Sequence, residues 1–210
     1  MRMRSRLTVS FSVALLGACL TPGHLEAQFH RFDLGTDTSE LRPGFTRITA
    51  RSVYDKALGY GWKTRDELRE QHKSYSREWT YNESRGREQP PPIYSNEVTC
   101  DCVRSDRPNS FLIDLAPGDY FVWVLSGLSA GSVREYHDFD MSISGDGQRT
   151  ESTIKIPGPY RFEKREWAGT VGDGPLAIDL VRRTDWLLSA VVGYPAEQEE
   201  DARREFLDAL

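Results

Sequence analysis

One stretch of the sequence, residues 111–125, constrains the fold more than any other part of the chain. Two apolar runs rich in β-branched and aromatic residues flank Ala116-Pro117-Gly118-Asp119. Proline presets φ for one turn position and glycine allows a positive φ at the next, so the pattern predicts a β-hairpin. The second arm, residues 120–125, is apolar at every position, which indicates a strand buried on both faces.

Further strand patterns recur roughly every 10 to 12 residues on both sides of this stretch. Apolar Phe139, Met141 and Ile143 alternate with polar residues, which predicts a half-buried strand, and Gly145-Asp146-Gly147 predicts the turn after it. Other strands are expected at residues 29–35, 45–48, 153–156, 160–171, 176–181 and 186–194. Without intervening long helices, this series predicts an all-β chain folded as an antiparallel β-sandwich or jelly roll.

The 210 residues suffice for one domain with segments attached at either end. Residues 1–27 resemble an export signal, with a basic start and an 11-residue apolar run. Leu16-Gly17-Ala18-Cys19 resembles a lipobox that would make Cys19 a lipidated N-terminus; cleavage after Ala27 is the alternative. The sandwich is predicted over residues 29–195, and a short C-terminal helix over residues 196–210. The protein is predicted to be exported, either as a membrane-anchored lipoprotein or as a secreted or periplasmic protein.

Residues 63–109 differ in character from the strands around them. They hold nine basic and nine acidic residues and a run of three prolines, Pro90 to Pro92. We expect a long surface excursion here, with a short helix near residues 65–72, and an aromatic loop at residues 59–62 just before it. An excursion of this length in a compact domain is expected to be functional or partly ordered.

Charge and cysteine content narrow the function further. Three of the 27 basic and one of the 32 acidic residues lie in residues 1–27, so the remaining chain has a net charge of −7. A negative surface repels phosphate backbones, which argues against nucleic acid as a partner. Beyond Cys19 the chain has Cys100 and Cys102, and the sequence leaves open a strained disulfide or two reduced surface thiols.

Four stretches, in this order along the chain, resemble a known family. They are Phe32-Asp33-Leu34-Gly35 with Gly44 to Arg47, Gly59-Tyr60-Gly61-Trp62, residues 111–123, and Trp186 to Ala190 running to Tyr194-Pro195. The chain resembles a galactose-binding-like, malectin-like β-sandwich module, such as the N-terminal domain of rhamnogalacturonan acetylesterase-like enzymes. The resemblance implies a secreted module that binds carbohydrate, attaches to a cell surface, or supports a neighbouring catalytic domain.

We therefore expect an exported, non-catalytic carbohydrate-binding or accessory module that needs no cofactor. Sugar rings stack on flat aromatic faces flanked by polar groups. The candidate binding residues chosen on this basis are Tyr60, Trp62, Trp79, Tyr81, Asn82, Tyr94 and Trp167. Trp123 and Trp186 are expected in the core instead. The alternatives are an envelope protein that binds another protein through its C-terminal helix, and the N-terminal part of a larger polysaccharide-active enzyme.

Two other chemistries are weaker readings of the sequence. Gly127 to Gly131 fits the G-x-S-x-G pattern of a nucleophile elbow, but the later part of the chain lacks the acid-then-histidine order that such hydrolases need. Asp138 and Asp140 with Glu135, or Asp33 alone, offer oxygens to calcium, whereas a solvated acidic strand face explains the first group better. We assign neither catalytic nor metal-binding residues.

Overall fold

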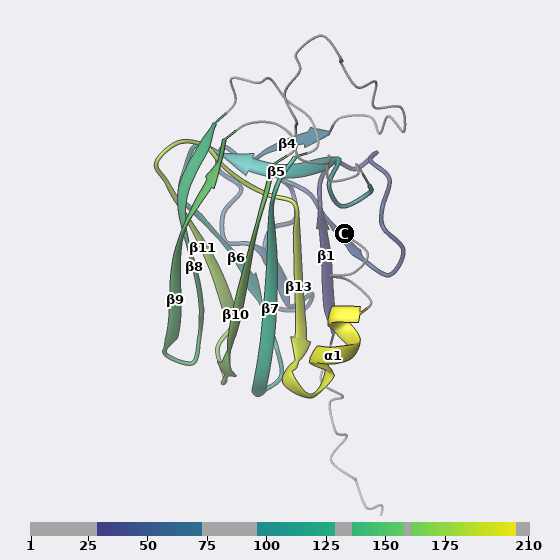
Figure 1. Ribbon diagram of the computed structural model, residues 1–210, viewed down its shortest axis with the longest axis vertical. Coiled ribbons are helices and arrows are strands. Elements are labelled where there is room, and N and C mark those ends of the chain that lie inside the picture. The colour runs from purple at the N-terminus through teal and green to yellow at the C-terminus, as the bar shows by residue number, and fades with distance from the viewer. Residues whose placement is uncertain (1–28, 73–95, 129–135, 158–160, 205–210) are drawn as a thin grey trace, which may run out of the picture.

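The computed structural model describes residues 29–72, 96–128, 136–157 and 161–204, and these form an all-β sandwich with three sheets (Figure 1). Sheet A has the order β10-β7-β13-β1-β2, with bounds Phe162–Val171, Gly118–Gly127, Ala190–Pro195, His30–Leu34 and Thr46–Ile48. Sheet B has the order β3-β6-β11-β8-β9, with bounds Tyr60–Trp62, Asn109–Ile113, Leu176–Arg182, His137–Gly145 and Gln148–Ile156. The predicted fold class is confirmed, and the pairing is antiparallel except between β1 and β2.

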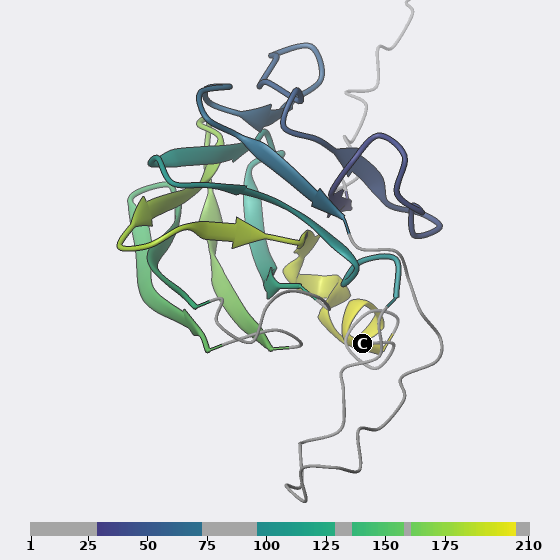
Figure 2. The same cartoon turned by 90° about the horizontal axis from the view of Figure 1, so that it is seen from above.

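A third, smaller sheet lies across one end of the sandwich. Sheet C has the order β12-β5-β4, with bounds Trp186–Leu188, Asp101–Ser105 and Arg69–His72. Figure 2, seen from above, shows its three strands side by side across that end. Sheet C thereby closes the core at the end of the molecule opposite α1 (Figure 1).

The main core lies between sheets A and B. Side chains from both sheets are fully buried there, among them Phe32, Trp62, Phe111, Phe139, Ile154 and Ile178. A second apolar cluster covers the other face of sheet A and includes Trp123, Leu125, Val192 and Tyr194. Because β7 contributes to both clusters, the side chains of residues 120–125 are buried as predicted, except that of Phe121, which is only partly buried. The expected core positions of Trp123 and Trp186 are confirmed.

The predicted hairpin at residues 111–125 is wrong. β6 pairs with β3 and β11 in sheet B, whereas β7 pairs with β10 and β13 in sheet A. The connection from Ile113 to Gly118 therefore crosses from one sheet to the other. Both arms are apolar because they face the same core from opposite sides.

The last predicted strand is likewise divided between sheets. Residues 186–188 form β12 in sheet C, and residues 190–195 form β13 in sheet A. Ser189 lies at the crossing point, where its hydroxyl donates to the carbonyl of Gly127 and its backbone N–H donates to Leu125. A single buried residue with its polar groups satisfied thus redirects the chain.

The charged segment at residues 63–109 contains strands near both of its ends, which corrects two expectations. Residues 69–72 form β4, paired with β5, and not a helix. β5 is almost wholly buried, so this part of the segment is not a surface excursion. Residues 60–62, expected in a loop, form the short strand β3 against β6. Residues 73–95 lie outside the described part of the chain.

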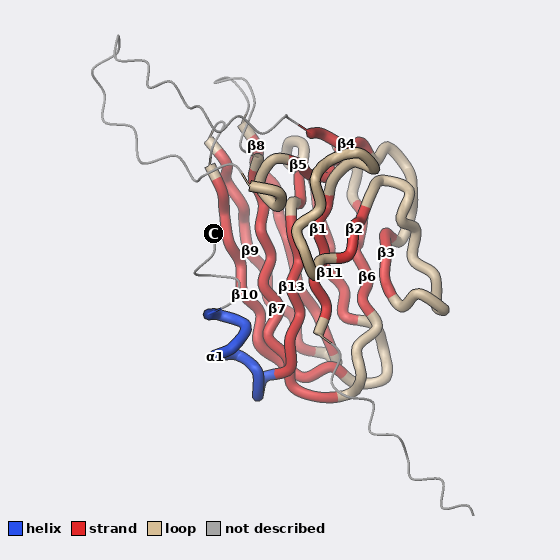
Figure 3. The backbone as a smooth tube through the Cα atoms, turned by 90° about the vertical axis from the view of Figure 1, so that its right-hand side faces the viewer, coloured by secondary structure: helices blue, strands red, loops and turns tan. Residues whose placement is uncertain are grey.

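The C-terminal part begins as predicted with helical structure. A 3-10 turn, η2 (Ala196–Gln198), leads into α1 (Glu199–Ala202), which lies beside sheet A (Figure 3). Ala202 is buried against the second apolar cluster. Residues 205–210 lie outside the described part, as do the leader and Cys19.

Candidate functional site

The two outer faces of the sandwich differ in chemistry, and this difference locates the candidate site. The outer face of sheet A is apolar and buried, with α1 and Val98 against it. The outer face of sheet B is polar, because the alternation in β8 turns Phe139 and Met141 inward and Asp138 and Asp140 outward. The open polar face is thus the one on sheet B.

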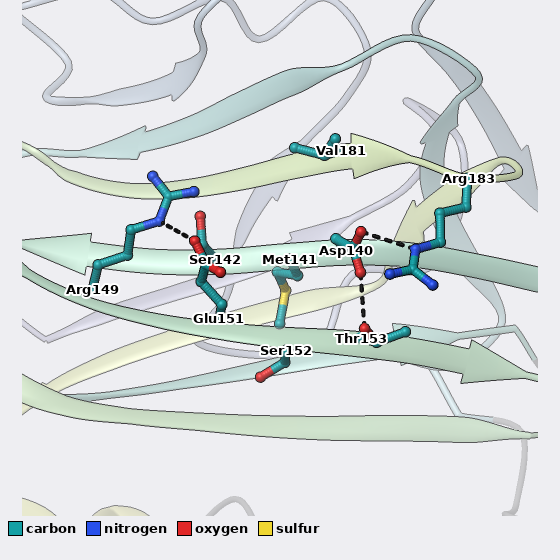
Figure 4. A pocket seen from close by; sticks show the side chains of 9 residues that line it. All are labelled: Asp140, Met141, Ser142, Arg149, Glu151, Ser152, Thr153, Val181 and Arg183. Atoms are coloured by element: carbon teal, nitrogen blue, oxygen red, sulfur yellow. Dashed lines mark hydrogen bonds and ion pairs between the residues drawn. The ribbon is translucent and has the colours of Figure 1, made fainter.

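Two adjoining hollows form a groove on this face, which we call the sheet B groove. The first encloses about 420 Å³ and is lined from β8, β9 and β11 by Asp140, Met141, Ser142, Arg149, Glu151, Ser152, Thr153, Val181 and Arg183 (Figure 4). The second encloses about 380 Å³ and extends across β11 to β6 and the end of β3. Arg149 and Val181 line both hollows, so the two are continuous.

One end of the first hollow is organised around Asp140. The Arg183 Nε donates to Asp140 Oδ2 at 2.9 Å, and the Thr153 hydroxyl donates to Asp140 Oδ1 at 2.8 Å. These two hydrogen bonds, first that from Arg183, hold the pKa of Asp140 below its usual range. The carboxylate therefore stays ionised near neutral pH and fixes the orientation of the arginine.

The other end is organised around Arg149 and Asp179. Arg149 Nε donates to Glu151 Oε1 at 2.9 Å, and its Nη1 lies 3.8 Å from Asp179 Oδ2. Asp179 in turn accepts a 2.7 Å hydrogen bond from the hydroxyl of Ser110 on the neighbouring strand. Figure 4 shows the Arg149 and Arg183 side chains at opposite ends of the hollow with Val181 between them.

Apolar surface at the groove is small but exposed. Val181 is 45% exposed in the floor that both hollows share. Tyr136, 48% exposed, precedes β8, and its hydroxyl donates to Asp138 Oδ2 at 3.2 Å. Partial desolvation and this hydrogen bond raise the pKa of Tyr136, so the phenol stays protonated. The groove thus presents paired polar groups around the aliphatic side chain of Val181. The aromatic ring of Tyr136 lies just before the start of β8, one of the strands that line the groove.

Two of the candidate residues from the sequence are core residues. Trp62 is 0% exposed and its indole N–H donates to the carbonyl of Thr49. Trp167 is 2% exposed and lies in the main core. Neither ring has a free face for a sugar, so their assignment to binding is wrong. The cause is the alternation of each strand, which turns these large apolar side chains inward.

Tyr60 is half-buried, with its ring centroid 4.9 Å from that of Phe32, and packs against the core. It does not line either hollow. The other candidates, Trp79, Tyr81, Asn82 and Tyr94, lie outside the described residues, and their role stays a prediction. The serine of the elbow pattern, Ser129, and Glu135 also lie outside them.

The structure also places the possible metal ligands and the cysteines. Asp140 is engaged by Arg183 and Thr153, and within the described ranges no group of three or more His, Cys, Asp or Glu side chains is arranged to hold a metal ion. Cys100 and Cys102 are buried and form no disulfide with each other, which contradicts both the disulfide and the surface thiols. Across these same ranges, no helix has the length and apolar character to cross a membrane.

Sequence reasoning missed the groove, although its residues follow a visible pattern. The sequence predicts an acidic outer strand face for Asp138, Asp140 and Ser142, and it predicts Val181 only as one of a run of strand residues. An apolar residue at an outward position directly before two arginines, in the order Val181-Arg182-Arg183, is the available signal. What was missing was the knowledge that β9 and β11 flank β8.

Comparisons with known proteins agree with the fold. No family model matches the chain, and no curated protein matches it. Among solved structures, the chain is similar to the YxiM protein of Bacillus subtilis, with 22% identity and a TM-score of 0.53 over 80% of this chain and 40% of that one. It is also similar to a β-glucuronidase of Bacteroides uniformis, with 13% identity and a TM-score of 0.52 over 80% of this chain and 18% of that one. The chain therefore spans less than half the length of these proteins and shares with them a β-sandwich fold.

Proposed function

We propose that the chain is a carbohydrate-binding module and that the sheet B groove holds the glycan. The observation that carries this proposal is the groove itself, an open polar hollow whose donors and acceptors are fixed by one another around an exposed Val181. The sandwich fold, shared with a part of a β-glucuronidase, supports the same reading.

The chemistry of the groove suits a chain of hydroxyl groups. Each sugar hydroxyl donates one hydrogen bond and accepts others, so it pairs well with adjacent arginine donors and carboxylate acceptors. Arg183 uses Nε for Asp140, which leaves its terminal nitrogens directed away from this bond, and Arg149 is held in the same way by Glu151. The methyl groups of Val181 would meet the C–H face of a ring. Because the described residues that line the groove include no aromatic side chain, we expect modest affinity.

The test is a glycan array and insoluble-polysaccharide pull-down with residues 28–210, beside an Arg149→Gln variant. Arg149 contributes to both hollows and is half exposed, so its replacement leaves the core intact. Loss of its charged hydrogen bonds is expected to weaken binding by about 10- to 100-fold.

Arg203→Gln is the matched control. Arg203 is also paired with two carboxylates, Glu166 and Glu199, but lies in the segment that follows α1, beside sheet A. The proposal predicts that this variant binds like the unmodified domain. An equal loss of glycan binding in both variants would contradict the proposed site. Absence of binding to any glycan would contradict the proposed function.

We further propose that the module is exported, anchored through Cys19 and non-catalytic. The sequence of residues 1–27 supports export and anchoring. The non-catalytic role is supported by the sequence after Gly127 to Gly131, where an acid followed by a histidine does not occur in the order that such hydrolases need. A Cys19→Ala variant of the full chain, expressed in a bacterium with lipoprotein processing, should lose incorporation of labelled fatty acid. Unchanged labelling would contradict the anchor.

A further inference from the structure

We propose that the sheet B groove selects neutral glycans over glycans that carry carboxylates. This inference rests on the proposed function and names the class of ligand. It follows from the charges that line the groove and from how they are paired.

The charges in the groove are balanced. The residues that line the two hollows include three cations, Lys63, Arg149 and Arg183, and three carboxylates, Asp140, Glu151 and Asp179. A groove with no excess of positive charge offers an anionic sugar no net attraction. The domain around it is acidic, with seven more acidic than basic residues beyond residue 27.

Both arginines are committed to carboxylates of the protein. Arg183 lies 2.9 Å from Asp140, and Arg149 lies 2.9 Å from Glu151 and 3.8 Å from Asp179. A sugar carboxylate that approached either guanidinium would come close to these acidic groups, and like charges at such separations repel by at least about 1 kcal/mol. A neutral hydroxyl meets no such repulsion and accepts from the arginine while it donates to the carboxylate.

Two of the carboxylates that set this preference, Asp140 and Asp179, are held by hydrogen bonds. The bonds from Arg183 and Thr153 keep the pKa of Asp140 low. Asp179 accepts hydrogen bonds from the hydroxyls of Ser110 and Ser142 at 2.7 and 3.4 Å. Asp140 and Asp179 are thus held in the groove by hydrogen bonds from side chains of neighbouring strands.

The experiment compares one glycan with and without charge. The best neutral ligand from the array is oxidised at its C6 hydroxymethyl groups to carboxylates, and binding of both forms to residues 28–210 is measured by calorimetry at low salt. We expect the oxidised form to bind at least about tenfold more weakly. Added salt should narrow this difference, because it screens exposed charges.

Asp140→Asn locates the effect. The amide keeps one acceptor oxygen but leaves Arg183 without a counter-charge, so the tenfold preference should shrink or reverse. Glu200→Gln is the control, since it removes one exposed negative charge on α1, against the other sheet. A shift of equal size in both variants would assign the preference to the net charge of the domain and overturn the role of the groove.

The two proposals fail in different ways. Equal or tighter binding of the oxidised glycan, or an array dominated by uronate-containing glycans that the Arg149→Gln variant no longer binds, overturns the neutral preference and leaves the proposed function intact. Absence of binding to every neutral and acidic glycan overturns the proposed function, and this inference with it.

Discussion

At the scale of single residues, two carboxyl groups, those of Asp33 and Asp101, are buried in the sandwich. Asp33 on β1 is 3% exposed, and Asp101 on β5 is also buried. Among the described residues, each has one carboxyl oxygen for which no hydrogen-bond partner is found. Burial, followed by the nearby charge of Asp101, raises the pKa of Asp33 to about 7. Burial also raises the pKa of Asp101, to about 6. Asp101 fits because Gly35 has no side chain at the place its carboxyl group occupies.

These two residues predict that the protein is more stable in mild acid. The native state holds protons on Asp33 and Asp101 that the unfolded chain has released above pH 4, so the free energy of unfolding falls as pH rises from about 4 to 7. Asp33→Asn removes one of these charges and keeps an acceptor for the backbone N–H of Arg42. We expect it to raise the free energy of unfolding at pH 8 by about 2–4 kcal/mol and to have little effect at pH 4. Urea denaturation at both pH values checks this, and a loss of stability at pH 8 would contradict it.

Trp167 gives a second prediction at this scale. A β-carbon added to Gly169 would lie 2.5 Å from the Trp167 ring, and one added to Gly145 would lie 3.1 Å from it. Gly169→Ala therefore forces the indole to move and should cost about 1–3 kcal/mol. Denaturant unfolding followed by tryptophan fluorescence measures the loss, and an unchanged midpoint would show that the ring relocates freely.

The same tryptophan shows where residue-level prediction from sequence ends. Trp167 stands among charged residues, so its surroundings in sequence allowed either an outward or an inward ring. The alternation of β10 against β7 decides for the inward position. The residue type shows that a side chain can stack on a sugar. Whether its ring is exposed depends on which side chains of the strand point into the core, and the sequence around Trp167 does not determine this.

At the scale of elements, the β8–β9 hairpin has a turn that its sequence predicted. Gly145 pairs with Gln148, which leaves Asp146 and Gly147 as a two-residue turn with φ of +39° and +77°. Two positive φ values match the right-handed twist of the strands, and glycine tolerates them best. This turn fixes the register that places Glu151 and Thr153 opposite Ser142 and Asp140 in the groove.

Gly147→Ala is predicted to destabilise the protein by about 1 kcal/mol. An added β-carbon at Gly147 meets nothing within 4 Å, so the cost is that of the backbone conformation alone. Gly174→Ala is the matched control, since that site is equally open and its φ is not positive. Thermal unfolding of both variants should show a lower melting temperature for Gly147→Ala only; an equal change in both would contradict the argument.

Most strand positions and this turn were thus accessible from the sequence, but β3, β4 and β5 and the partners of the strands were not. Residues 111–113 and 120–125 have the apolar pattern of a hairpin, and they belong to different sheets. A local pattern records which faces are buried and not which neighbour buries them. For the same reason the break at Ser189 was invisible, because both halves of that segment are equally apolar.

At the scale of the whole molecule, the two cysteines of the described residues can be used to measure whether the sandwich is intact. Cys100 and Cys102 are buried beside and within β5, and burial raises the pKa of Cys100 to about 12. Since the thiolate is the reactive form, residues 28–210 should show no thiol reacting with an aromatic disulfide reagent in the native state and two in strong denaturant. Rapid native labelling would contradict the burial of β5.

The candidate site is a property of this scale, which is why the sequence did not reveal it. The groove joins residues near 63, 109, 140, 150 and 180, and they become neighbours only when β3, β6, β11, β8 and β9 assemble in that order. The fold class required only the spacing of strands, which is a local property. The site required their order.

The pairing of β1 with β13 has a consequence for how the protein is made. His30 lies opposite Gly193, so the first strand of the domain finds its partner in the last one, and β13 separates β1 from β7. Sheet A therefore stays incomplete on the ribosome until residue 195 has been synthesised, and contacts so distant in the chain form slowly. A chain that cannot complete its sandwich early stays unfolded for longer during synthesis, and the unfolded state is the one in which a translocation channel accepts a polypeptide.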